Sequence, residues 1–77
     1  MNIINPKKLL NSKWTAINPI NNEKHFIVTD VVYDDNDLVL SCVLEAILTG
    51  NQSEIDWTKL KDSQAWQQGW QHISGSR

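Results

Sequence analysis

The chain has a single cysteine, few glycines and no long apolar run, and each of these absences excludes a class of protein. Cys42 is the only cysteine among 77 residues, so no internal disulfide can form, and the Cys/His spacing of a zinc finger is missing. The three glycines do not form a glycine-rich phosphate loop. No apolar stretch approaches the roughly 18 residues that a transmembrane helix needs. We therefore expect a small domain with no metal, no cofactor and no membrane partner.

The chain also lacks the positive excess that is typical of nucleic-acid-binding domains, because its formal net charge is −2. The charges are nevertheless separated along the sequence. Acidic residues dominate residues 30–56, whereas the segment before them carries four lysines and a single acidic residue. These lysines are Lys7, Lys8, Lys13 and Lys24.

The first residues lack the charged start and long apolar run of a secretory signal. A lone cysteine fits a reducing compartment, in which disulfides rarely persist. The expected location is the cytoplasm.

Tryptophan, by contrast, is abundant, with four residues in 77. They are Trp14, Trp57, Trp66 and Trp70. Each indole can bury roughly 150–250 Å², which matters in a chain that can hide only about 60% of its surface. Three of them cluster near the C-terminus, which indicates a terminal segment that docks on the rest. We expect two or three to be mostly buried and one, Trp70 or Trp14, to be partly exposed.

The middle of the sequence predicts two long β-strands. Residues 24–33 are rich in β-branched and aromatic residues, and residues 38–49 alternate so that Leu40, Cys42 and Leu44 share a buried face. Residues 34–37 predict the turn between them. Shorter strands are expected at residues 13–18 and 53–57, the second at a sheet edge after a tight turn at Gly50 and Asn51.

Short helices are predicted on both sides of these strands. Asn5 and Pro6 suit a cap and the first position of a helical turn over residues 7–10. A second helix is expected over residues 63–68, ended by Gly69 in a left-handed conformation. Alternatively, that helix continues through Gly69 and places Trp66, Trp70 and Ile73 on one face.

The predicted fold class is therefore α+β. It consists of a three- to four-stranded antiparallel β meander, or an SH3-like small barrel, with short N- and C-terminal helices. Trp57 and Trp66 are expected to pack on the apolar face of the sheet near Leu44 and Leu60. Residues 1–73 form one domain in this prediction, and residues 74–77 form a disordered tail.

Several motifs, in order, resemble the small Trp-rich bacterial protein family of uncharacterised function. They span residues 4–70 and are Asn5-Pro6-Lys7-Lys8-Leu9-Leu10, Lys13-Trp14-Thr15-Ala16, Glu23-Lys24-His25-Phe26, Leu44-Glu45-Ala46 with Leu48-Thr49, and Trp57 through Trp66 and Gly69-Trp70. The resemblance implies a stand-alone Trp-rich bacterial protein with no assigned activity and no assigned site residues.

No residue pattern predicts catalysis. The acidic run 34–37 fits a solvated turn better than a calcium loop, and Cys42 lies on an apolar strand face, where a thiol behaves as a small hydrophobe. Glu45 could form an acid/base pair with His25 or Lys24 from the neighbouring strand, although a cross-strand ion pair is the simpler interpretation. We expect no catalytic residues and no enzymatic activity.

Two functions remain for the exposed surface. The first is a non-enzymatic protein-binding or adaptor module, which meets an unknown protein partner through an apolar patch around an exposed tryptophan. The alternative is a nucleic-acid-associated small barrel, in which a basic N-terminal rim holds phosphates and an exposed indole stacks on a base. The candidate binding residues are Trp14, Trp70, Lys7, Lys8, Lys13, Lys24 and His25.

Overall fold

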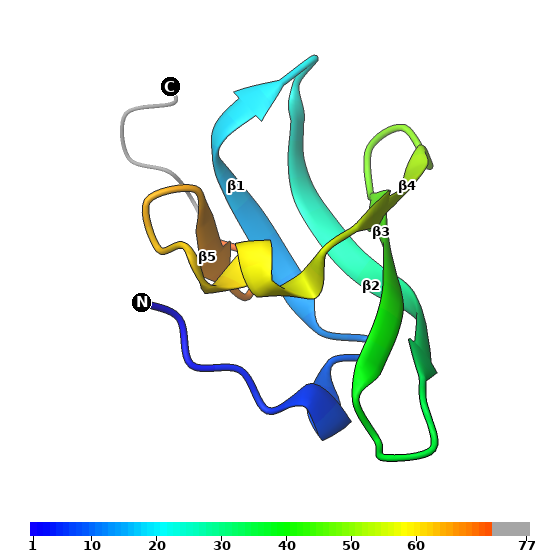
Figure 1. Ribbon diagram of the computed structural model, residues 1–77. Coiled ribbons are helices and arrows are strands. Elements are labelled where there is room, and N and C mark those ends of the chain that lie inside the picture. Colours follow the sequence, from blue (N-terminus) through cyan, green and yellow to red (C-terminus); the bar gives the residue numbers. More distant parts are fainter. Residues whose placement is uncertain (72–77) are drawn as a thin grey trace.

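The computed structural model describes residues 1–71 as one curved antiparallel sheet with two short 3-10 helical turns (Figure 1). The elements in chain order are η1 (Pro6–Lys8), β1 (Lys13–Ile20), β2 (Glu23–Tyr33), β3 (Val39–Ala46), β4 (Gln52–Ile55), η2 (Trp57–Lys61) and β5 (Trp66–Gln68). The strand order is β4-β3-β2-β1-β5, and all neighbouring pairs are antiparallel. The first four strands therefore follow one another as hairpins, and β5 returns to pair with β1.

The predicted α+β class is wrong, because the part of the chain that the structure describes contains no α-helix. The predicted N-terminal cap is confirmed, since the Asn5 side chain accepts a hydrogen bond from the Lys7 backbone N–H (3.0 Å) and Pro6 begins the turn. The element itself is only a single 3-10 turn. The molecule is a small β domain.

The predicted C-terminal helix over residues 63–68 is also wrong. A turn is followed there by β5, in which Trp66 pairs with Ala16 of β1. A short helix is only marginally stable, whereas β5 supplies hydrogen bonds to a backbone edge of β1 that would otherwise lack them. Gly69 has the predicted left-handed conformation (φ 79°), but in a turn that follows a strand. The alternative helix reaching Ile73 extends beyond the described residues.

The sheet does not close into a barrel. β4 and β5 are its outer strands and do not pair with each other. Instead η2 connects them across the open side of the sheet (Figure 1) and buries Leu60 completely. Asp56 begins this turn, because its side chain accepts a hydrogen bond from the Thr58 N–H (3.0 Å). The predicted edge strand exists, but it ends before Trp57, which belongs to η2.

β2 and β3 form the predicted antiparallel hairpin. Cys42 and Leu44 are buried as predicted, but Leu40 is 65% exposed, so the prediction that it is buried is wrong. The register explains the difference, because Tyr33 lies opposite Val39 where unbroken alternation would place Leu40. Leu40 is thus the extra residue of a β-bulge. Val39 packs against the core in its place.

The acidic run at residues 34–37 forms the predicted turn between these strands. The Asp34 carboxylate accepts hydrogen bonds from the backbone N–H groups of Asn36 (2.8 Å) and Leu38 (2.9 Å). Asp37 adopts a left-handed conformation (φ 63°), which Asp tolerates better than most residues. The Asp34 side chain therefore holds the turn together.

Trp14 is the largest side chain of the core and is 1% exposed. Its Nε1 donates a hydrogen bond to the Ser12 hydroxyl (2.9 Å), so burial leaves no polar atom of the indole unpaired. Trp57 and Trp66 pack against the same core, as expected, whereas Trp70 is 45% exposed. The other buried members are Leu9, Val28, Cys42, Leu44 and Leu60.

Among the described residues, no helix has both the length and the apolar character that crossing a membrane requires. The predicted domain end at residue 73 and the predicted tail at residues 74–77 lie outside the described residues.

Candidate functional site

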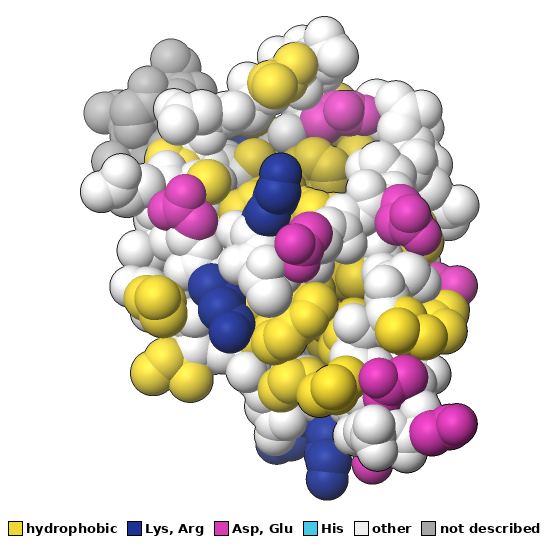
Figure 2. Space-filling model, in the orientation of Figure 1, with side chains coloured by type: hydrophobic (Ala, Val, Ile, Leu, Met, Phe, Trp, Pro, Cys, Tyr) yellow, Lys and Arg dark blue, Asp and Glu magenta, His cyan; other side chains and the backbone are white. Residues whose placement is uncertain are grey.

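A cavity of about 460 Å³ lies on the inner face of the sheet, between the two outer strands. Figure 2 shows apolar side chains at the base of a hollow in this part of the surface. We call this cavity the trough. The residues that line it come from all five strands and the turn before β5, and they are Ala16, Asn18, Ile20, Glu23, Phe26, Leu44, Ser53, Glu54, Ile55, Ala65 and Trp66.

The trough is open because β1 leaves its partner strand in the middle. β1 and β2 pair regularly as far as Thr15, and then again only at Ile20. Between these points the Ile17 N–H donates a hydrogen bond to the carbonyl of Ala65 on the other side (2.9 Å). Pro19 has no N–H with which to restore the ladder. The departure of β1 leaves space between its end and β4.

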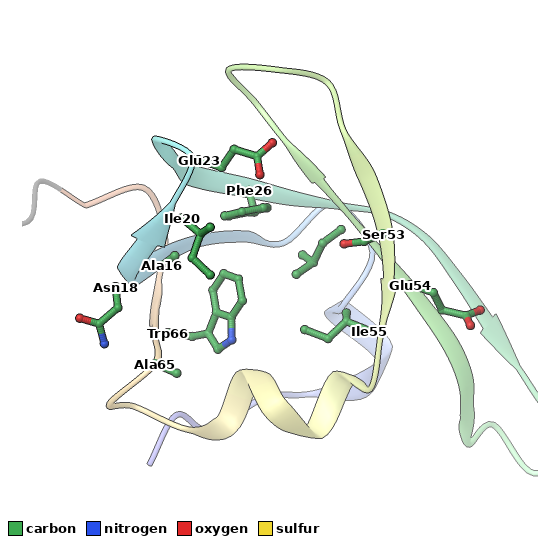
Figure 3. A pocket seen from close by; sticks show the side chains of 11 residues that line it. Ala16, Asn18, Ile20, Glu23, Phe26, Ser53, Glu54, Ile55, Ala65 and Trp66 are labelled. Carbon is green, nitrogen blue, oxygen red and sulfur yellow. The ribbon is translucent and has the colours of Figure 1, made fainter.

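Two aromatic rings form the floor of the trough. Phe26 and Trp66 are in edge-to-face contact, with ring centroids 5.3 Å apart and planes at 80°. Such a contact contributes about 0.5–1.5 kcal/mol beyond burial, so the floor is formed before any ligand arrives. Figure 3 shows Ile20 and Trp66 directed inward from one side and Ser53 and Ile55 from the other. Ile20 is 74% exposed, which makes it available for contact.

Two glutamates border the trough, Glu23 and Glu54, and they direct their carboxylates differently. Glu23 Oε2 accepts hydrogen bonds from the Thr49 hydroxyl and the Asn51 amide (2.9 Å). These bonds lower the pKa of Glu23 below its ordinary value, so the group is ionised at neutral pH. The Glu54 side chain points away from the cavity (Figure 3). The trough therefore combines an apolar interior with an acidic rim.

The turn after β5 folds over the outer face of the sheet, opposite the trough. Thr15 anchors it: the buried hydroxyl donates to the Gly69 carbonyl (2.7 Å) and accepts from the Gln71 N–H (2.8 Å). Trp70 Nε1 donates to the Phe26 carbonyl (3.0 Å). Phe26 lies opposite Trp14, so both face inward, and Thr15, the neighbour of Trp14 on β1, faces outward. We call these three hydrogen bonds the Thr15 clamp.

Four of the predicted binding residues lie around this turn. Lys13 Nζ lies 5.3 Å from the centroid of the Trp70 ring, and the His25 ring lies 6.3 Å from it. Lys24, His25 and Trp70, together with Gln71, line a hollow of about 260 Å³. We call Lys13, Lys24, His25 and Trp70 the basic platform.

The remaining predicted binding residues lie elsewhere. Trp14 is buried in the core and cannot stack on a ligand from solvent. Lys7 and Lys8 are exposed on η1, where Lys7 lines a separate hollow with Tyr33 and Asp37 beside the acidic turn. The hollow at Trp70 includes neither of these two lysines.

Two of the titratable side chains considered for catalysis, Glu45 and His25, are engaged in structural contacts. Glu45 accepts a hydrogen bond from the Gln52 side chain (2.9 Å), and His25 Nε2 donates to the Gln71 carbonyl (3.1 Å). Cys42 is a buried free thiol, and burial raises its pKa to about 11, which makes it a poor nucleophile. Within residues 1–71, no three His, Cys, Asp or Glu side chains are grouped as a metal site would require.

None of the residues that line the trough was among the binding residues predicted from the sequence. Phe26 and Trp66 look like ordinary core residues in the sequence, and their contact joins segments far apart in the chain. The available signal was Asn18-Pro19-Ile20, in which a proline interrupts a strand beside an apolar residue. Thr15 gave no signal, because its role depends on β5.

Comparison with known proteins agrees with the sequence motifs. Residues 12–71 match the family described as "Tryptophan-rich protein (DUF2389)". The matched range contains all five strands, the four tryptophans and every residue that lines the trough. No curated protein and no solved structure matches the chain. The chain therefore belongs to this tryptophan-rich family, whose function is uncharacterised.

Proposed function

We propose that the chain is a non-enzymatic protein-binding module and that the trough receives a segment of its partner. The observation that carries the proposal is an apolar cavity, open between two sheet edges, with the Phe26 and Trp66 rings at its floor. Ligand cavities typically measure about 300–1,000 Å³ and are lined mainly by apolar and aromatic groups. The trough, at about 460 Å³, falls in this range. Aromatic side chains in such pockets commonly dominate the affinity of protein interfaces.

The chemistry of the lining supports binding rather than catalysis. A general acid or base must titrate near the working pH and be directed at its substrate. Glu23 is held ionised by two donors, and Glu54 points away from the cavity. The buried Cys42 thiol is not among the lining residues. What the trough offers to a ligand is shape, apolar surface and negative charge at the rim.

A bait that differs only inside the trough tests this proposal. Ser53 is exposed and directed into the cavity, so Ser53→Trp fills the trough from β4 without disturbing the core. We expect affinity capture from lysate, followed by mass spectrometry, to identify a protein that binds the parent chain and is lost with Ser53→Trp. The matched control is Ser53→Thr, which keeps the cavity open and should retain the partner. A partner that binds all three chains equally would contradict the role of the trough.

The basic platform supports a second candidate function, the binding of single-stranded nucleic acid. Trp70 is 45% exposed beside the cationic Lys13, an arrangement in which a base can stack while lysines contact phosphates. We expect a single-stranded oligonucleotide to quench Trp70 fluorescence at low salt, and the affinity to fall steeply as salt rises. Lys13→Gln should weaken this binding, whereas Lys8→Gln on η1 should not. Absence of binding at low salt would remove this candidate.

The proposal includes a cytoplasmic location. This location is supported by Cys42, a free thiol that is fully buried and forms no disulfide, as is usual for proteins of a reducing compartment. Fluorescence microscopy of a tagged chain would test the location directly.

A further inference from the structure

The two outer edges of the sheet differ in how they are covered. Along β5, the Asn2 side chain donates a hydrogen bond to the Trp66 carbonyl (2.8 Å) and the Gln68 side chain donates to the Ile3 carbonyl (2.8 Å). The N-terminal segment thus lies along that edge. Within residues 1–71, no strand pairs with the outer side of β4. An edge strand without a cover is a template for pairing with another chain.

The register shows which backbone groups β4 presents at its open edge. Ala46 N–H donates to the Asn51 carbonyl (2.8 Å), and the pairing continues through Glu45 with Gln52. Inward and outward hydrogen bonding alternates along an antiparallel strand. Gln52 and Glu54 therefore direct their N–H and C=O groups away from β3. These four groups are placed to bond an extended segment.

The side chains of β4 alternate between the two faces of the sheet. Ser53 and Ile55 point into the trough, while Glu54 points to the outer face (Figure 3). A strand added along β4 would repeat this pattern, because side chains of paired strands alternate together. Every second residue of the added strand would enter the trough toward Trp66. The residues between them would lie on the outer face beside Glu54.

Resting on the proposed function, we propose that the partner segment binds as an additional antiparallel or parallel strand along β4. Its alternate residues are apolar and fill the trough, and a lysine or arginine lies beside Glu54. Charge complementarity selects this partner, because Glu54 is the charged residue of β4 and its side chain points away from the trough, on the side where the remaining residues of an added strand would lie. Opposite charges across neighbouring strands attract, whereas an acidic segment is repelled.

β4 is protected from such pairing only by its shortness and by the charge of Glu54. Natural sheets protect their edges with lysine, proline or bulges, and Gln52–Ile55 contains none of these residues and pairs with β3 in unbroken register. The only charge on the strand is the glutamate that would select a basic partner.

The test is a selection of random dodecapeptides on phage against the folded chain, followed by affinity measurement with the synthetic peptides. We expect the enriched sequences to alternate apolar residues with positions rich in lysine or arginine. When the peptide amides are N-methylated one at a time, methylation at every second position should abolish binding and methylation at the positions between should not. Only the amides of the first set would face β4. Insensitivity to N-methylation at all positions would overturn strand addition.

Variants of the chain separate this inference from the proposed function. Glu54→Pro removes the N–H that points away from β3, a change that an edge strand tolerates, and should weaken the selected peptides by at least about tenfold. Its matched control, Glu54→Thr, keeps that N–H and should lose only the preference for basic residues. Urea unfolding of each variant shows whether the fold is kept.

The outcomes are distinct. If Ser53→Trp abolishes peptide binding and Glu54→Pro does not, the trough binds peptides without strand addition, and only the present inference fails. If neither variant changes binding, or no peptide is enriched, the proposed function fails as well. If the chain instead forms dimers that Glu54→Pro dissociates, the occupant is a second copy, and the basic partner is excluded.

Discussion

The two faces of the sheet place tryptophans of the same short segment in opposite settings. Trp66 lies on the inner face, where it packs against the core and meets Phe26 edge to face. Trp70 lies on the outer face, where hydrogen bonds hold it and 45% of its surface stays exposed. The change of face occurs at Gly69, whose left-handed backbone turns the chain after β5. Apolar packing therefore fixes the inner indole, and polar contacts position the outer one.

The sharpest test of this comparison removes one indole from each face. Trp14→Ala deletes the largest core side chain and should cost about 3–5 kcal/mol, which approaches the whole stability of a small domain, about 5 kcal/mol. Trp66→Ala should also destabilise strongly, because Trp66 packs against the same core. Urea unfolding followed by circular dichroism measures both losses.

Trp70→Ala is the matched variant on the outer face. Because the side chain is half-exposed, we expect it to cost much less than either inner variant. An equal loss of stability for Trp14→Ala and Trp70→Ala would contradict the distinction between the faces.

The second prediction concerns the Thr15 clamp. Thr15→Val keeps the side-chain shape but removes the hydroxyl that bonds Gly69 and Gln71. Leaving two backbone groups without this partner should cost about 1–3 kcal/mol. The indole N–H of Trp70 should then exchange faster with solvent, while that of Trp14 should not. Unchanged exchange at Trp70 would show that its own bond to Phe26 is sufficient.

The third prediction uses the buried thiol of Cys42. Burial raises its pKa from 9.0 to about 11, so the folded chain holds the proton more tightly than the unfolded chain. The contribution of this thiol to the stability of the fold is fully present below pH 9.0 and is lost as the pH rises toward about 11. Other groups titrate in this range, so the measurement is the difference in urea unfolding between the parent and Cys42→Ala. A pH-independent difference would contradict the assignment.

The smallest expected effect is at the rim of the trough. Thr49→Val removes the hydrogen bond that does most to lower the pKa of Glu23, so that pKa should rise toward its ordinary value. A carboxyl group whose pKa is lowered by folding stabilises the fold at pH values above its ordinary pKa, and this stabilisation is lost as the pH falls. The variant should therefore lose part of the stabilisation that Glu23 contributes at neutral pH. An NMR titration of the carboxyl carbons measures the shift. Asp56, whose lowered pKa depends on Thr58, provides the internal control.

Features that depend on neighbouring residues were predicted from the sequence. The Asn5 cap, the turn at residues 34–37, the β2–β3 hairpin and the positive φ of Gly69 all follow from local chemistry. The bulge at Leu40 was not predicted, because alternation continues through it in the sequence. Its existence depends on the register that the whole hairpin adopts.

Features that depend on distant segments were not predicted. Residues 66–68 carry a weak local preference, and their pairing with β1 decides that they are a strand. The trough depends on that pairing. One partly exposed tryptophan, Trp70 or Trp14, was predicted, and the structure shows that it is Trp70. The burial of Trp14 follows from its inward position on β1, which could not be distinguished from an outward position in so short a predicted strand.

The hydrogen bonds of Asn2 have a consequence for the order in which the chain folds. Its backbone N–H donates to the Lys61 carbonyl (2.9 Å), and its side chain reaches Trp66, 64 residues away. During synthesis on the ribosome, the β1–β2 and β2–β3 hairpins can form as soon as their residues emerge. β1, however, keeps one unpaired edge until β5 follows, and such distant contacts form slowly. We therefore expect the native sheet to be completed in a late step that joins the segment around Asn2 to β5.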